Sequence, residues 1–107
     1  MSGLSTHVLD AALGRPASGL AVTVTAPDGQ VHAAVTDADG RVATLLASPL
    51  RSGSYQIRFD TAGYFAATGQ KAFYPEVTIC FTVENGREHH HVPLLLSPFA
   101  YSTYRGS

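Results

Sequence analysis

Short segments in which apolar and polar residues alternate run through most of this chain, and they constrain its fold more than any other feature. LAVTVTA at 20–26, SYQIRFD at 54–60 and VTICFTV at 77–83 are typical. Successive residues of a strand point to opposite sides of a sheet, so this period of two gives each segment one apolar and one polar face. The sequence therefore predicts strands over most of its length.

Turn residues separate these segments. Asp28-Gly29 and Asn85-Gly86 are dipeptides typical of hairpins, and DADG at 37–40 marks a third turn. TAGYFAAT at 61–68 is expected to form a short helix that ends before Gly69. Further strands are expected at 6–13, 31–37, 41–46 and 90–96. Short strands at this spacing, without alternating long helices, predict an all-β fold: a two-sheet antiparallel β-sandwich of seven to eight strands with one short helix.

Length and composition indicate one globular domain over residues 1–107. Hydrophobic residues make up 45% of the chain and charged residues 14%, which argues against disorder. Seven Lys and Arg against eight Asp and Glu give a net charge of −1. This balance lacks the basic footprint that binding to nucleic acid or to an anionic membrane requires, so neither partner is expected.

Cys80 is the only cysteine, so no intrachain disulfide can form, which suits a reducing compartment. Cys80 shares one strand face with Thr78 and Thr82, and these residues alternate with Val77, Ile79, Phe81 and Val83. We expect a small, partly buried packing residue rather than a reactive thiol. The segment MSGLSTHVLD has no basic region before an apolar run, and no stretch approaches the ~20 apolar residues of a membrane span. A soluble cytoplasmic protein is expected.

Strand alternation isolates several polar side chains from the core. His7 should point away from the face of Thr6 and Val8, and His91 away from the apolar face that begins with His90. In the tail YSTYRGS at 101–107, Ser102 and Tyr104 share one face if the segment is extended. Such isolated polar groups need either solvent or a function.

Two other interpretations of the histidine run HHH at 89–91 stay open on pattern alone. His89 and His91 project from one strand face as two zinc ligands would, but His7 or His32 would have to complete the set. The simpler alternative is exposed or hydrogen-bonded histidines at a strand entrance. The chain has no glycine-rich phosphate loop and no G-x-S-x-G nucleophile turn.

Taken together, four segments resemble the 5-hydroxyisourate hydrolases, the transthyretin-related enzymes of urate breakdown. They stand in the family's order and cover nearly the whole chain: LSTHVLDAALGRPASGLAV, TDADGRVATL, FYPEVTICF and HHHVPLLLSPFAYSTYRGS. The last is the most specific. The resemblance implies a transthyretin-like sandwich and a homotetramer, a dimer of dimers, with active sites in the channel where dimers meet.

Transthyretin itself, a hormone carrier, is similar but differs at the informative positions. It has lysine, glutamate and threonine where this chain has His7, Arg41 and His91, and it continues beyond the position of Ser107. All four positions resemble the hydrolases. His90 departs from the hydrolase pattern, which usually has an aromatic residue there, but alternation turns it away from the proposed site.

The resemblance implies hydrolysis of 5-hydroxyisourate to 2-oxo-4-hydroxy-4-carboxy-5-ureidoimidazoline, without metal or cofactor. His7 and His91 would act as base and acid, in an order that the sequence leaves open. The Arg41 guanidinium would clamp the substrate and the developing negative charge. Tyr104 would hydrogen-bond the ring, and Ser107 or its terminal carboxylate would position water.

Two alternatives come from other classes of protein. A transthyretin-like carrier would bind a small aromatic ligand without turning it over, but it would need shape rather than two imidazoles beside a guanidinium. A structural or adhesion module would explain none of the isolated polar residues.

Overall fold

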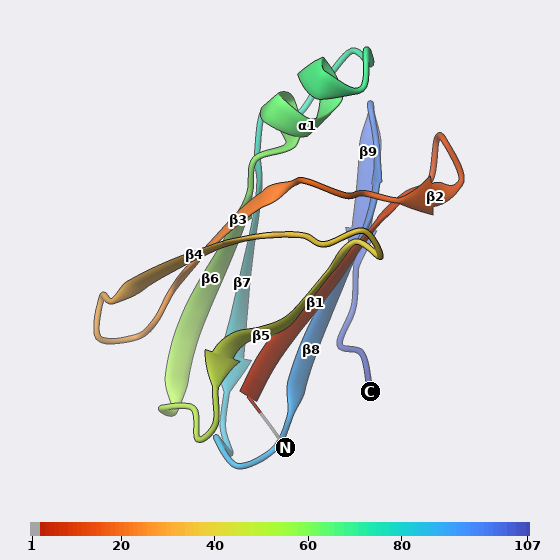
Figure 1. The fold of residues 1–107 in the computed structure, drawn as a ribbon. Helices are drawn as coiled ribbons and strands as arrows, with labels where there is room; N and C mark the ends of the chain where they lie inside the picture. Colours follow the sequence, from red (N-terminus) through yellow and green to blue (C-terminus); the bar gives the residue numbers. More distant parts are fainter. Residues whose placement is uncertain (1–2) are drawn as a thin grey trace.

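A computed structural model describes residues 3–107, and this part of the chain forms nine strands and one helix in two packed sheets (Figure 1). The elements are β1 (Gly3–Asp10), β2 (Arg15–Pro16), β3 (Ala21–Thr25), β4 (Val31–Val35), β5 (Arg41–Ala47), β6 (Gly53–Phe59), α1 (Thr61–Ala67), β7 (Val77–Val83), β8 (His90–Ser97) and β9 (Ala100–Thr103). The first sheet has the order β2-β1-β8-β9, with β5 also paired to β1, and the second has the order β4-β3-β6-β7. The all-β sandwich with one short helix is confirmed.

Two details of the expected sandwich are wrong. Residues 3–107 contain nine strands rather than seven to eight, because the short β2 and β9 add to those expected. In addition, β1 and β8 run parallel, in register from Leu4 opposite His90 to Asp10 opposite Leu96, so the first sheet is mixed rather than antiparallel. Hairpin signals fix only the direction of consecutive strands, and these two strands lie at opposite ends of the sequence.

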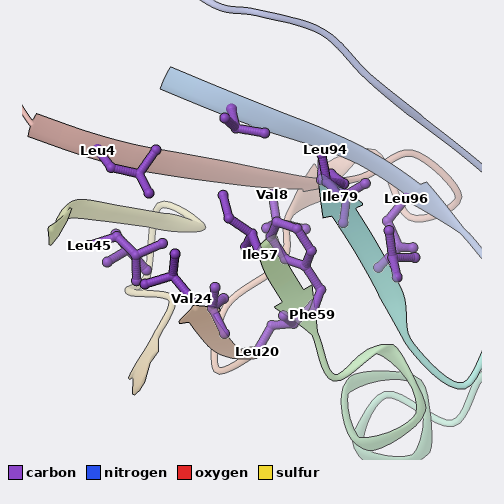
Figure 2. Packing of buried hydrophobic residues seen from close by; sticks show 14 of the residues in the cluster. Leu4, Val8, Leu20, Val24, Leu45, Ile57, Phe59, Ile79, Leu94 and Leu96 are labelled. Atoms are coloured by element: carbon purple, nitrogen blue, oxygen red, sulfur yellow. The ribbon is translucent and has the colours of Figure 1, made fainter. Parts of the chain in front are cut away.

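The core lies between the two sheets, where the apolar faces of the strands meet (Figure 2). Leu4 and Val8 of β1 and Leu94 and Leu96 of β8 are fully buried, as is Ile57 of the opposite sheet. Burying one such side chain stabilises the fold by about 1.5–3 kcal/mol. The period-two alternation thus specifies the inner faces, and the residues between these positions point outward.

Helix α1 is attached to the first sheet through a buried carboxylate at the end of β1. Asp10 has no exposed surface and accepts hydrogen bonds from the Tyr64 hydroxyl at 2.6 Å, the Gln70 amide at 2.9 Å and the backbone N–H of Leu13 at 2.9 Å. Burial alone would raise the pKa of Asp10, but these hydrogen bonds outweigh burial and lower it. Burial and the bond to Asp10 raise the pKa of Tyr64 to about 12.

Cys80 corrects one expectation. It is exposed on the outer face of β7 rather than partly buried, because it alternates with the buried Ile79. His90 is buried, with 4% of its surface exposed, as its strand face predicts. In the part of the chain that the structure describes, no helix is long and apolar enough to cross a membrane.

Candidate active site

His7 and Arg41 are direct neighbours on the outer face of the first sheet. They lie opposite each other in the antiparallel pair of β1 and β5. The turn before β5 fixes this register, because the Asp37 carboxylate accepts from the backbone N–H groups of Asp39 and Arg41, each at 2.9 Å. Gly40 has φ +75°, and a Cβ there would collide with the carbonyl oxygen of Val8, so only glycine fits.

The ring of His7 is held in one orientation by a backbone carbonyl. Its Nε2 lies 2.9 Å from the oxygen of Asp39. A carbonyl oxygen can only accept, so Nε2 carries the hydrogen in this bond. When the ring is neutral, Nδ1 therefore holds the free lone pair.

His91 lies on β8, beside Ser5 of the parallel strand β1. Its Nδ1 is 2.7 Å from the Ser5 hydroxyl, which is also 3.0 Å from Nε2 of His89. Partial burial lowers the pKa of His91, and the positive charges of Arg41 and of the nearby histidines lower it further. The imidazole is thereby kept neutral and able to accept a proton at neutral pH.

The C-terminal tail lies against His91. Beyond β9 the chain continues antiparallel to β8 (Figure 1), and the N–H of Gly106 donates to the carbonyl oxygen of His91 at 2.8 Å. A Cβ at Gly106 would lie 2.5 Å from Cδ2 of the His91 ring. The glycine therefore allows a close approach that brings the next residue, Ser107, to the site.

A pocket of about 270 Å³ opens on this outer face. Its lining residues are Ser5, Thr6, Arg41, Val42, Ala43, His89, His91 and Ser107. The structure thus brings together three of the predicted site residues, Arg41, His91 and Ser107, while His7 stands beside Arg41 at the margin.

Tyr104 lies elsewhere. It is 59% exposed and lines a neighbouring pocket of about 230 Å³, between β7 and β8, together with Phe81 and Cys80. His91 and Arg105 also line this more apolar hollow. Within one chain, Tyr104 and Arg41 therefore do not share a pocket.

Sequence reasoning missed Ser5, and it considered His89 only as a metal ligand or as an exposed or hydrogen-bonded residue at a strand entrance. Strand alternation offered a signal for Ser5, because it stands two residues before His7 and thus on the same face. The residues described, 3–107, contain no cluster of three His, Cys, Asp or Glu side chains with the geometry of a metal site. What the pocket offers is a guanidinium and imidazoles, which suit charge stabilisation and proton transfer.

Comparison with known proteins gives a consistent result. Residues 4–106 match the model of the HIUase/Transthyretin family. The chain is 44% identical to a 5-hydroxyisourate hydrolase of Caulobacter vibrioides, with all of both chains covered. It is 45% identical to a 5-hydroxyisourate hydrolase of Mus musculus, over 99% of this chain and 96% of that protein.

Solved structures agree with the fold. A 5-hydroxyisourate hydrolase from Klebsiella pneumoniae superposes with a TM-score of 0.90 at 39% identity, with all of both chains covered. Sea bream transthyretin, in complex with thyroxine, superposes with a TM-score of 0.87 at 33% identity, over 96% of this chain and 93% of that chain. With matches of this extent in both sequence and structure, the chain belongs to the HIUase/transthyretin family.

Proposed function

We propose that this protein is a hydrolase that opens the ring of 5-hydroxyisourate in urate degradation. The observation that carries the proposal is the pocket that combines Arg41 and His91, with His7 at its margin. Relatives named 5-hydroxyisourate hydrolase match the chain over essentially its whole length, which supports the same activity. We take residues 1–107 as one hydrolase domain that works in the cytoplasm.

Ring opening needs three contributions that these side chains supply. Attacking water must lose a proton, the carbonyl oxygen gains negative charge, and the departing ring nitrogen needs a proton. His7 and His91 serve the two proton transfers, since neutral imidazoles both accept and donate near neutral pH. The planar donors of Arg41 hold the substrate and stabilise the oxyanion. Ser107, at the end of the pocket wall, positions the water.

The roles of Tyr104 and of the assembly complete the proposal. The pocket lies on an outer sheet face and stays open on one side within a single chain. A homotetramer, built as a dimer of dimers, would close it by bringing two such faces together, and water exclusion would strengthen its electrostatics. The exposed Tyr104 would then contact the substrate ring from the rim of the channel.

The competing function is a carrier that binds a small aromatic ligand without chemistry. Its one specific support is the likeness to transthyretin, whose solved structure contains thyroxine. Binding alone does not require Arg41 beside two imidazoles, so the hydrolase is favoured.

The deciding experiment generates 5-hydroxyisourate freshly from urate with urate oxidase and follows its ultraviolet absorbance with and without the protein. Spontaneous decay is the control. Catalytic amounts of protein should accelerate the decay severalfold or more, and the acceleration should survive exhaustive chelation of metals. Decay at the spontaneous rate, even with stoichiometric protein, would exclude the hydrolase and leave the carrier.

A further inference from the structure

The Ser5 hydroxyl lies between two imidazoles. Its Oγ is 2.7 Å from Nδ1 of His91 and 3.0 Å from Nε2 of His89. Ser5 itself is 7% exposed, His91 is half-buried at the pocket, and His89 is exposed. The two rings are nearly parallel, with an interplanar angle of 17° and centroids 6.4 Å apart. A chain of hydrogen bonds therefore runs along the pocket wall from the half-buried His91 to the exposed His89.

The Ser5 hydroxyl can arrange its hydrogen bonds to the two imidazoles in two ways. A hydroxyl has one hydrogen to donate and two lone pairs, so between two ring nitrogens it can donate to one while it accepts from the other. If Ser5 donates to His89, then Nδ1 of His91 carries a hydrogen and its Nε2 has a free lone pair. If Ser5 donates to His91, then Nε2 of His91 carries the hydrogen instead.

His7 makes a contrast with His91. The carbonyl of Asp39 can only accept, so it holds the hydrogen of His7 on Nε2. The Ser5 hydroxyl can reverse its direction, so His91 can present either a lone pair or a hydrogen at the same nitrogen. Of these two histidines, only His91 has a partner whose hydrogen bond can reverse. His91 can therefore change between base and acid without moving its ring.

We propose that Ser5 and His89 form a proton relay beside His91, which connects the reacting nitrogen of His91 to the more exposed imidazole of His89. The proposal rests on the hydrolase function above. In it, Nε2 of His91 accepts one proton from the attacking water, the Nδ1 hydrogen passes to Ser5, and the Ser5 hydrogen passes to Nε2 of His89. The exposed His89 then releases a proton from its other ring nitrogen to water.

Ring opening releases one proton overall, and the relay carries it away. Hydrolysis breaks the ring C–N bond and forms a C–O bond to water, and the new carboxylic acid is ionised at neutral pH. One proton of the water therefore leaves through the relay, and the other reaches the departing nitrogen by way of His7. When product leaves, Nε2 of His91 returns a proton to water while His89 takes one up, which restores the starting state with no net change.

The charged and titratable groups around His91 are consistent with an outward path. The charges that act on it from other elements are those of Arg41 of β5 and His7 of β1. Cys80 of β7 and Tyr104 and Arg105 of the tail line the neighbouring hollow, and Ser107, with its terminal carboxylate, lines the pocket itself. Arg105 is paired with Glu88 at 3.3 Å. The positive charge of Arg41 disfavours a second cation on His91, so a proton gained there is driven toward the exposed His89.

The first test separates the hydroxyl from the size of the side chain. Ser5→Ala should lower kcat by about tenfold or more while KM stays within about twofold, since general acid–base catalysis contributes about 10²–10⁴-fold and losing the relay removes part of it. Ser5→Thr keeps the hydroxyl and should keep most of the activity. Equal losses in both variants, or none in either, would overturn the relay.

The second test separates proton transfer from positioning. His89→Gln keeps an amide that can bond Ser5 but cannot carry a proton onward, so kcat should fall about tenfold in dilute buffer and recover as imidazole buffer is added. The matched control is His32→Gln, on the exposed β4, which should match the wild type at every buffer concentration. A loss in His89→Gln that no buffer rescues, or no loss, would contradict the relay.

The two proposals fail separately. If the wild type does not accelerate decay of 5-hydroxyisourate, the proposed function fails. The relay is then tested by nitrogen NMR of the histidine rings. Protonating His89 should change the tautomer of His91 in the wild type and in Ser5→Thr but not in Ser5→Ala. The same response in all three proteins, or in none, would overturn the relay. If the wild type is active and Ser5→Ala and His89→Gln both match it, only the relay fails.

Discussion

A polar cluster lies near each end of strand β1, one around Asp10 and the other around Ser5 and His91. The two clusters differ in burial and in how firmly their hydrogen bonds are fixed. At one end, Asp10 is fully buried, and three donors are fixed on its carboxylate. At the other, His91 is half-buried beside a pocket, and its partner Ser5 can reverse the direction of its hydrogen bond.

The difference lies in what each cluster leaves free. The carboxylate of Asp10 has no route to a ligand, and its bonds join α1 to the sheet, so its pKa shift contributes to stability. The pKa shift of His91 instead keeps a lone pair available at a pocket that also holds Arg41. Substitutions at Asp10 should therefore lower stability without lowering catalytic activity. Substitutions around His91 should lower activity without lowering stability.

The largest effect is expected at the reactive end. Arg41→Ala and His7→Ala should each lower kcat for ring opening by about 10²-fold or more, because a charge stabiliser or a proton-transfer group is lost. Both side chains lie on the outer face, so the urea midpoint should stay nearly unchanged. The matched control is Arg58→Ala in the other sheet, which loses only an exposed ion pair with Glu76 and should keep full activity. Comparable losses in Arg58→Ala would abolish the distinction between the faces.

Asp10→Ala should show the opposite pattern. It leaves the donors of Tyr64, Gln70 and Leu13 without an acceptor, and a buried unpaired group costs about 1–3 kcal/mol. We expect the free energy of unfolding in urea to fall by about 3 kcal/mol. Turnover per folded molecule should stay within about twofold of the wild type. A stable Asp10→Ala protein with lost activity would reverse the assignment of the two ends.

The pH dependence of stability and that of activity should distinguish the two clusters within one protein. The folded-state pKa of Asp10 lies below its ordinary value of 3.8, so its stabilisation is present above that value and is lost as pH falls through the folded pKa. The pKa of Tyr64 is raised from 10.0 to about 12, so its stabilisation is lost as pH rises across that interval.

His91 titrates between these limits. Its pKa is lowered from 6.5, so its basic form persists somewhat below that pH and is then lost about tenfold per pH unit. As pH falls below 6.5 but stays above 3.8, kcat/KM should therefore fall while circular dichroism stays native. Activity and ellipticity that fall together across this interval would contradict the separation.

The smallest effect is expected for Tyr64→Phe. It removes one of the three donors on Asp10 and should cost about 1–2 kcal/mol of stability, with no change in kcat. Because the remaining donors hold the carboxylate less well, acid unfolding should begin at a higher pH than in the wild type. Acid unfolding at an unchanged pH would mean that the Tyr64 hydrogen bond does not contribute to the low pKa of Asp10.

Much of this molecule could be predicted from its sequence, because alternation is a local signal. Period two placed His7 and His91 away from the core and His90 in it, and the structure confirms these faces. Turn residues marked most strand ends. The resemblance supplied Arg41 and Ser107, and the structure places both at one pocket with His91.

What the sequence could not supply depends on contacts between distant segments. Ser5 reaches His91 across 86 residues only because β1 and β8 pair in parallel, and Asp10 reaches Tyr64 across 54. No periodicity in either segment encodes such a partner. The close approach of Gly106 to the His91 ring is similar, since it depends on a contact between two distant side-by-side segments rather than on a local pattern.

The most direct test of this account compares His91→Ala with the wild type in the decay of freshly generated 5-hydroxyisourate, at equal concentrations of folded protein and at neutral pH. The account predicts that the wild type accelerates decay well beyond the spontaneous rate and that His91→Ala, with an unchanged urea midpoint, loses about 10²-fold or more of that acceleration. Near-normal turnover by folded His91→Ala would contradict the assignment of chemistry to this end of β1.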